Sequence, residues 1–182
     1  MSNVAIRPGS VEDVPRLTEI YNYYVEETAT SFDLEKHCAP DRVTSWFSNY
    51  SSNGIYRIFV AELDELVVGY CTSSQFRVKA AYATSVETSV YLDKEYFGRG
   101  IGSKLYNALF ASLIGTSAHR AYGGVTLPNA GSVALHKNFG FREVGIYREV
   151  GFKLGRFHDV CWFEKEIGSL EGTSGVTNPV FT

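Results

Sequence analysis

The feature of this sequence that most constrains its fold is a cluster of glycines between an expected strand and an expected helix. Gly98, Gly100 and Gly102 stand in the hexapeptide Gly-Arg-Gly-Ile-Gly-Ser at 98–103. Apolar and polar residues alternate over about 83–92, as in a strand, and apolar residues recur at helical spacing over about 100–113. Glycines at such a junction let the backbone approach a ligand closely. Successive N–H groups and the helix N-terminus can then bind one anion.

Two common phosphate-binding motifs are excluded at this loop. The dinucleotide fingerprint needs a third glycine where Ser103 stands, and the nucleoside-triphosphate loop needs a lysine directly after its last glycine. Arg99 contributes a positive charge within the loop. We therefore expect the loop to bind the phosphate or diphosphate of another kind of ligand, with a purely structural turn as the alternative.

The remaining pattern predicts one α/β (α+β) domain over residues 1–167, without internal repeats. Strands are expected at 4–7, 58–63, 66–72, 83–92, 121–125, 144–149 and 160–164, and helices at 10–26, 100–113 and 132–138, with a short helix after Pro40. Residues 168–182 are rich in Gly, Ser and Thr and lack periodicity, so we expect a poorly ordered tail.

The charge balance argues against a nucleic-acid-binding protein. The chain has 17 Lys and Arg against 20 Asp and Glu, and no basic stripe accompanies its aromatic residues. The charge is uneven, because residues 1–92 carry a net −5 and residues 93–182 a net +2. An anionic ligand is therefore expected in the second half.

The cysteines and the hydrophobic pattern predict a cytoplasmic protein without a bound metal. Cys38, Cys71 and Cys161 show neither a disulfide framework nor zinc-ligand spacing. The histidines likewise have no metal-ligand spacing. No stretch is long and apolar enough for a signal peptide or a membrane span, so no membrane partner is expected.

Several blocks of the sequence, in order, resemble one enzyme family. The segment SVYLDKEYFGRGIGSKLY resembles the acyl-coenzyme A signature of the GNAT N-acetyltransferases, although Phe97 replaces the usual Gln or Arg. The blocks IYNYYVEETATSF, VETSVYL, LPNAGSVALHKNFGF and GFKLGRFHDVCWF resemble the phosphinothricin and methionine sulfoximine acetyltransferase subfamily. Together the blocks cover nearly all of residues 4–167. The resemblance implies a GNAT fold with a mixed central sheet of about six to seven strands flanked by helices.

The resemblance implies acetyl transfer from acetyl-CoA to the amino group of a small amino-acid-like acceptor. Glu87 matches the carboxylate that the subfamily uses as general base, because most of a free amine is protonated at neutral pH. His136 stands where many GNAT enzymes place a tyrosine acid, and it is expected either to protonate the thiolate or to position the substrate. The subfamily also implies a homodimer with sites near the interface.

The remaining site residues fall into two expected groups. The coenzyme is expected to bind the backbone of one strand, the glycine loop and the start of a later helix, at Val90, Tyr91, Leu92, Gly98, Arg99, Gly100, Ile101, Gly102, Ser103, Asn129 and Ser132. The acceptor is expected to contact Arg77, Glu87, Thr88, Ser89 and Phe32, with Arg77 binding its carboxylate. Tyr24 and Tyr82 are further candidates for the walls of the site.

Two other functions stay open at this point. One is the same chemistry on another amine, such as a peptide N-terminus or a polyamine. The other is a sensor module that binds acyl-CoA but does not catalyse transfer.

Overall fold

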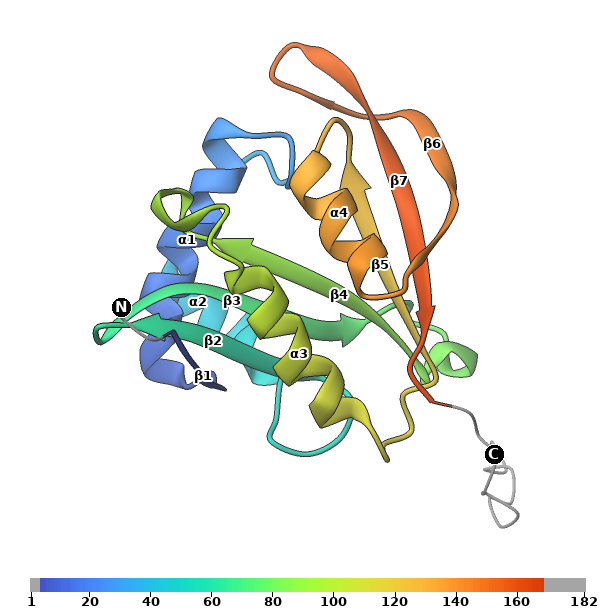
Figure 1. The fold of residues 1–182 in the computed structure, drawn as a ribbon. Coiled ribbons are helices and arrows are strands. Elements are labelled where there is room, and N and C mark those ends of the chain that lie inside the picture. Colours follow the sequence, from blue (N-terminus) through green and yellow to red (C-terminus); the bar gives the residue numbers. More distant parts are fainter. Residues whose placement is uncertain (1–3, 169–182) are drawn as a thin grey trace.

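The computed structural model describes residues 4–168, which form one seven-stranded sheet with helices on both faces (Figure 1). The strand order is β1-β2-β3-β4-β5-β7-β6. The strands are β1 Ala5–Pro8, β2 Arg57–Leu63, β3 Leu66–Gln75, β4 Ser85–Leu92, β5 Arg120–Thr126, β6 Arg142–Lys153 and β7 Arg156–Glu166. The helices are α1 Val14–Glu27, α2 Ala39–Ser45, α3 Ile101–Leu113 and α4 Ala130–Asn138. The predicted mixed sheet of about six to seven strands flanked by helices is confirmed.

The sheet is antiparallel except at its centre, where β4 and β5 run parallel. A parallel pair needs a crossover connection, and α3 supplies it. β4 and β5 pair only from Ser85–Arg120 to Glu87–Tyr122. Beyond this point the two strands diverge toward their carboxyl ends, so the sheet opens in its middle (Figure 1).

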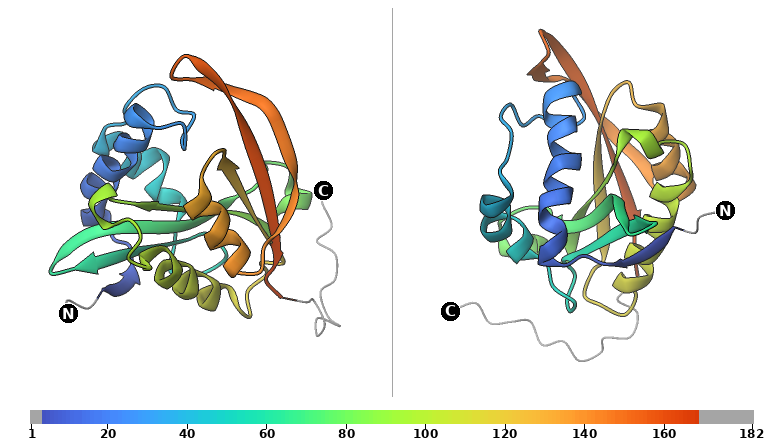
Figure 2. Two further views of the ribbon diagram at one scale, coloured as in Figure 1. Left: turned by 45° about the horizontal axis from the view of Figure 1, so that its top comes forward. Right: turned by 90° about the vertical axis from the view of Figure 1, so that its left-hand side faces the viewer.

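The helices form one layer on each side of the sheet (Figure 2). On one side lie α1 and α2, where apolar residues of α1 and of the segment after α2 pack with Ile58, Val60 and Tyr70. On the other side lie α3 and α4, over a larger core that includes Leu105, Leu109 and strand residues from β2 to β7. Because side chains alternate between the faces of a strand, β4 presents different residues to these two layers.

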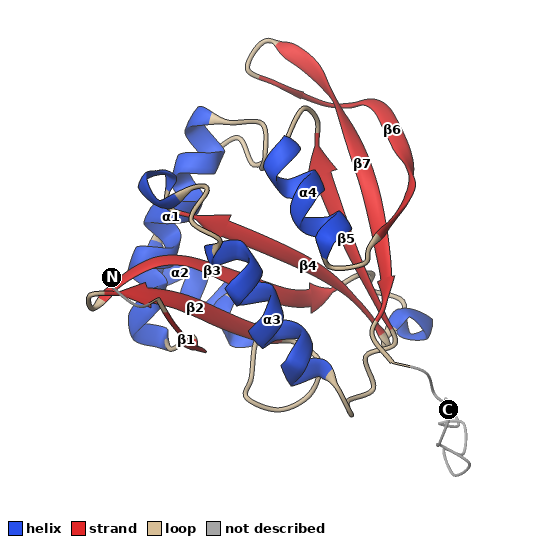
Figure 3. Ribbon diagram, in the orientation of Figure 1, coloured by secondary structure: helices blue, strands red, loops and turns tan. Residues whose placement is uncertain are grey.

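The structure shows β6 and β7 as a long hairpin that extends beyond the helices (Figure 3). The sequence predicts much shorter strands, at 144–149 and 160–164. The register of β6 shifts at Glu143/Gly145 and at Tyr147/Gly151, and most of its residues are exposed. Bulges and exposure both remove the period-two alternation of apolar residues on which strand prediction depends.

Other boundaries differ by a few residues. β3 continues to Gln75 rather than to residue 72, and α1 is preceded by a 3₁₀ turn at Val11–Asp13. α4 ends shortly before Gly140, whose φ of 77° is typical of the glycine that follows a helix. The expected tail lies outside the described residues except for Gly168.

Candidate active site

Glu87 lies at the point where β4 and β5 separate. Its partner on β5 is Tyr122, the last residue of the parallel pairing, and its partner on β3 is Ser74. Burial raises the pKa of the Glu87 carboxyl above its ordinary value, against the opposing effect of the Arg77 charge. A carboxylate with a raised pKa at the opening of the sheet is suited to accept a proton from a substrate.

Aromatic side chains surround the Glu87 end of the opening and hold Arg77. Phe76 stacks on Tyr122 with ring centroids 4.2 Å apart, and the edge of Trp162 meets Phe76 at 6.2 Å. The exposed Arg77 guanidinium lies 4.2 Å from the Phe76 ring centroid and 5.7 Å from that of Trp162. Arg77 donates to a backbone carbonyl but has no ion-pair partner among residues 4–168, so its charge remains available to an anion near Glu87.

A pocket of 240 Å³ lies on the same face of the sheet as Glu87. Ser74 and Ser89 line it, and these are the cross-strand partner and the same-face neighbour of Glu87. Its other polar lining includes Tyr21, Arg42, Tyr70 and Thr72, and we call it the hydroxyl-lined pocket. A wider depression of 740 Å³ over the outer side of α1 shares no lining residue with it.

Thr88 and His136 lie on the opposite face of the sheet, under α3 and α4. The Thr88 hydroxyl is 3.2 Å from the Tyr106 hydroxyl and donates to the Tyr122 carbonyl at 3.2 Å. The Tyr106 hydroxyl lies 3.3 Å from His136 Nε2. The structure thus places the expected substrate residues Ser89 and Thr88 on different faces, and only Ser89 lines the pocket beside Glu87.

The His136 imidazole is 5% exposed and both of its nitrogens face protein groups. Nδ1 lies 2.8 Å from the Ser132 carbonyl, so this nitrogen carries the proton and donates. Burial lowers the pKa of His136 below its ordinary value, against the raising effect of this backbone contact. The ring packs so closely over β5 that a Cβ at Gly123 would lie 2.4 Å from Nε2.

The glycine loop leads into α3 as the sequence predicts. Gly98 and Gly100 have φ angles of 74° and 73°, and a Cβ at either position would meet open space. Gly100 is the N-cap residue of α3, and the first turn carries no acidic residue. The exposed Arg99 side chain stacks 4.9 Å from the Tyr96 ring centroid. The backbone N–H groups of the glycine loop and of the first turn of α3 are therefore open and positively polarised, which suits them to bind an anion.

Two of the residues expected to contact the coenzyme, Leu92 and Asn129, form hydrogen bonds within the protein. The Tyr24 hydroxyl lies 2.6 Å from the Leu92 carbonyl and 3.1 Å from the Leu92 nitrogen. Asn129 is the N-cap of α4, and its side-chain oxygen accepts from the Ser132 N–H at 3.0 Å. Pairing of a ligand with Leu92 requires the Tyr24 hydroxyl to move, whereas the side-chain NH₂ of Asn129 can still donate.

Two expected wall residues lie outside the hydroxyl-lined pocket. Phe32 packs on the β6–β7 hairpin, where a Cβ at Gly151 would lie 2.3 Å from its ring. Tyr82 is exposed and meets Phe76 edge-on with centroids 6.0 Å apart. The described residues contain no group of three or more His, Cys, Asp or Glu side chains that could hold a metal, and none of their helices is long and apolar enough to cross a membrane.

Sequence reasoning missed Phe76, Tyr122 and Trp162, as well as Arg42 and Tyr70 in the pocket. Strand alternation places Tyr122 on one face of β5, but only the register with Glu87 brings it to the site. Arg42 belongs to the short helix expected after Pro40. No local signal distinguishes it from a surface arginine.

Comparison with known proteins identifies the family to which the chain belongs. A model of the acetyltransferase (GNAT) domain matches residues 6–162, so the chain belongs to the GNAT acetyltransferases. The crystal structure of a GNAT superfamily phosphinothricin acetyltransferase from Sinorhizobium meliloti, in complex with acetyl-CoA, superposes with a TM-score of 0.86. It is 27% identical, and the match covers 95% of this chain and 92% of that one.

The sequence relatives are more specific. A phosphinothricin N-acetyltransferase from Streptomyces coelicolor is 48% identical over 168 residues, which are 91% of this chain and 98% of that protein. An L-methionine sulfoximine/L-methionine sulfone acetyltransferase from Salmonella typhimurium is 29% identical over 164 residues, which are 90% and 95% of the two chains. The GNAT fold and the subfamily resemblance predicted from the sequence are confirmed.

Proposed function

We propose that this enzyme transfers acetyl from acetyl-CoA to the amino group of a small amino-acid-like acceptor of the phosphinothricin or methionine sulfoximine type. One observation carries the proposal: Glu87 stands at the opening between β4 and β5, between the glycine loop's side of the sheet and a polar pocket on the other side. A donor and an acceptor can therefore reach one carboxylate from opposite faces in a ternary complex.

The residues on the donor side fit acetyl-CoA. Its diphosphate can bind the free N–H groups at 98–103, where open space surrounds Gly98 and Gly100. Val90, Tyr91 and Leu92 pair with β3 but have no partner strand on the β5 side, where an extended pantetheine arm can add like a strand. Acetyl-CoA would supply an activated thioester, whose C–S bond breaks as the acceptor nitrogen bonds to the acetyl carbon.

Glu87 acts as the general base in this proposal. It takes the proton from the acceptor amine, directly or through one water, so that the nitrogen lone pair is free to attack. A backbone N–H of the 90–92 segment polarises the acetyl carbonyl. Arg77 binds the acceptor carboxylate. The amine and the carboxylate of an α-amino acid share one carbon, so the residues that bind them, Glu87 and Arg77, must lie close together.

We assign His136 a positioning role rather than that of an acid. Its lowered pKa keeps the imidazole neutral at neutral pH, and Nδ1–H already donates to Ser132. A thiol such as that of cysteine has a pKa of about 8.5, above neutral pH, so a departing alkyl thiolate can take a proton from solvent without a dedicated acid. His136 instead holds Tyr106 and the α4 segment against β5.

We further propose that the enzyme is a cytoplasmic homodimer. The subfamily resemblance implies the dimer, and the β6–β7 hairpin exposes six large apolar side chains that a second copy would cover: Val144, Tyr147, Val150, Phe152, Leu154 and Phe157. The free cysteines fit a reducing compartment. Light scattering of the wild type and of Phe152→Asp tests the dimer, with a shift to monomer expected in the variant.

Thiol release from acetyl-CoA tests the function. Phosphinothricin, methionine sulfoximine, spermidine and a short peptide are compared as acceptors, and mass spectrometry detects the acetylated product. We expect release with the first two acceptors. Release only with spermidine or the peptide supports another amine substrate, and coenzyme binding without release with any acceptor supports the sensor function.

A further inference from the structure

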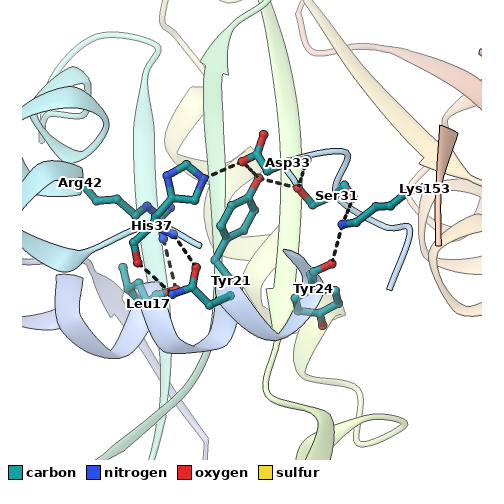
Figure 4. Close-up of polar contacts among 9 residues, drawn as sticks. Leu17, Tyr21, Tyr24, Ser31, Asp33, His37, Arg42 and Lys153 are labelled. Atoms are coloured by element: carbon teal, nitrogen blue, oxygen red, sulfur yellow. Dashed lines mark hydrogen bonds and ion pairs between the residues drawn. The ribbon is translucent and has the colours of Figure 1, made fainter. Parts of the chain in front are cut away.

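The hydroxyl-lined pocket contains a buried arginine, Arg42, that no acidic side chain of the described residues pairs with. Arg42, on α2, is 4% exposed and makes no ion pair among residues 4–168. Its guanidinium lies 3.8 Å from the Trp46 ring centroid and 4.8 Å from that of Tyr21, and one long hydrogen bond of 3.4 Å reaches the Leu17 carbonyl (Figure 4). A buried cation is costly unless it is paired, so most of its donors remain available to a ligand.

A second unpartnered donor lines the same pocket. Tyr70, on β3, is 1% exposed, and its hydroxyl has no hydrogen-bond partner within the described part of the chain. Burial raises the pKa of this phenol, against the opposing effect of the nearby Arg42 charge. The hydroxyl of the neighbouring Tyr50, by contrast, is already paired with Ser74 Oγ at 2.8 Å.

The acidic group of the pocket is already satisfied. Asp33 accepts from Tyr21 at 2.8 Å and contacts His37 Nε2 at 2.7 Å (Figure 4). Although burial opposes the effect, the hydrogen bonds from His37 and Tyr21 lower the pKa of Asp33 below its ordinary value. Asp33 thus stays ionised and partnered, and it orders the loop at the pocket rim rather than neutralising Arg42.

The strand register sets the direction in which an acceptor would lie. Ser74 pairs with Glu87, Thr72 with Ser89, and Tyr70 with Tyr91 along the β3–β4 ladder. Glu87 and Tyr91 are four residues apart, or about 13 Å between their Cα atoms, so one small acceptor reaches both ends only through the long side chains of Glu87 and Arg42. The Arg77 charge acts on Glu87, whereas Arg42 lies over Tyr21, whose ring meets Tyr91 at the other end of the ladder. An amino acid held at its amine and carboxylate by Glu87 and Arg77 would point its side chain toward Arg42 and Tyr70.

We propose that Arg42 and Tyr70 form a subsite for an anionic side-chain terminus of the acceptor. This subsite makes the enzyme prefer an acceptor that ends in a phosphinate, such as phosphinothricin, over one that ends in a neutral sulfone. The proposal rests on the proposed function, because it assumes that the amine binds at Glu87. A negatively charged oxygen would receive hydrogen bonds from the guanidinium and the phenol, which a neutral sulfonyl oxygen accepts more weakly.

The test compares kcat/KM for phosphinothricin and for methionine sulfone. In Arg42→Gln we expect kcat/KM for phosphinothricin to fall about 10–100-fold, mostly through a higher KM. For methionine sulfone we expect kcat/KM to fall less than about threefold. Arg42→Lys should recover part of the loss because it keeps the charge. Equal losses for both acceptors would instead mean that Arg42 binds the shared α-carboxylate or only supports the fold, and either result overturns the subsite.

Tyr70→Phe provides a variant that keeps the packing. It removes only a hydroxyl that has no hydrogen-bond partner among residues 4–168, so the protein should fold normally while kcat/KM for phosphinothricin alone falls about 3–10-fold. Arg7→Gln is the matched control, because this arginine pairs with Asp13 and Glu62 away from the pocket. Its ratio of the two kcat/KM values should equal that of the wild type.

Direct binding separates failure of the subsite from failure of the proposed function. Calorimetry measures phosphinothricin binding to the wild type and to Arg42→Gln, with no acetyl-CoA present. If neither acceptor is acetylated but phosphinothricin binds and the Arg42 variant binds it at least tenfold more weakly, the proposed function fails and the subsite stands. If the wild type does not bind it, or both bind it equally, the subsite is refuted whatever the activity.

Discussion

The two faces of β4 differ in chemistry although their residues alternate along one strand. Glu87, Ser89 and Tyr91 point toward α1 and α2, beside a pocket lined by hydroxyls and Arg42. Val86 and Thr88 point toward α3 and are fully buried, with Thr88 bonded to Tyr106. The first face has unpaired donors and a carboxylate with a raised pKa, whereas the polar groups of the second are hydrogen-bonded within the protein. The difference shows that polar residues alone do not mark a binding site, because a ligand can bind only to polar groups that lack a hydrogen-bond partner within the protein.

Glu87→Gln is the strongest test of the open face. The variant keeps the shape of the side chain but cannot accept the amine proton, so kcat should fall by about 10²–10⁴ at neutral pH and recover partly at high pH, where more amine is free. The wild-type rate should rise with pH through the raised pKa of Glu87, and this limb should be absent in the variant. Steady-state kinetics across pH check both expectations.

The thermal stability of Glu87→Gln serves as the control for its kinetics. Because the folded-state pKa of Glu87 lies above its unfolded value, the ionised carboxylate lowers stability as pH rises through that pKa. Glu87→Gln should therefore melt no lower than the wild type at neutral pH. An unchanged kcat in this stable variant would remove Glu87 as the base.

Gly100→Val tests the donor side, between α3 and the glycine loop. The φ of 73° is strained for valine, and relief of that strain would turn the N–H groups away from the diphosphate. We expect KM for acetyl-CoA to rise about tenfold or more, with a smaller change in KM for the acceptor. Gly115→Val is a matched control with a φ of 75° at the other end of the helix. A normal KM for acetyl-CoA in Gly100→Val would contradict the phosphate-loop role.

Arg77→Ala tests the acceptor end of the open face. The exposed guanidinium has no acidic partner among the described residues, so it is available to the acceptor carboxylate. Its loss should raise KM for the acceptor about tenfold. The KM for acetyl-CoA should change by less than about twofold. Equal effects on the two substrates would argue that Arg77 only supports the Phe76 and Trp162 stack.

Thr88→Val tests the face of β4 toward α3, whose polar groups are hydrogen-bonded within the protein. It should have the smallest effect on catalysis. The substitution removes the hydroxyl between Tyr106 and the Tyr122 carbonyl, and the unfolding free energy should fall by about 1–3 kcal/mol because buried partners are left unpaired. We expect kcat/KM to stay within about threefold of the wild type. Denaturant unfolding and kinetics check the two expectations. A loss of catalysis as large as that of Glu87→Gln would place the substrate on both faces.

The elements that carry the candidate site were predictable because their signals are local in the chain. The glycine cluster, the helix after it and the alternation around Glu87 each depend on neighbouring residues, and the structure confirms these elements with small shifts of their ends. The long β6–β7 hairpin was not predictable in full, since two register shifts and solvent exposure remove the alternating pattern. The roles of His136 and Thr88 depend on which face of the sheet they occupy, and Phe32 proved to pack on the hairpin.

The sequence alone determined the family, the order of strands and helices, and the loop with backbone N–H groups suited to an anion. Only the tertiary structure decided which polar groups are satisfied. Arg42 and Tyr70 are 28 residues apart in the chain, and they line one pocket because Trp46, directly after α2, packs on Tyr70 of β3. Likewise, three residues of parallel pairing decide where the sheet opens and which carboxylate stands there. Pairing and burial are relations between distant segments, so a local pattern of residue types does not contain them.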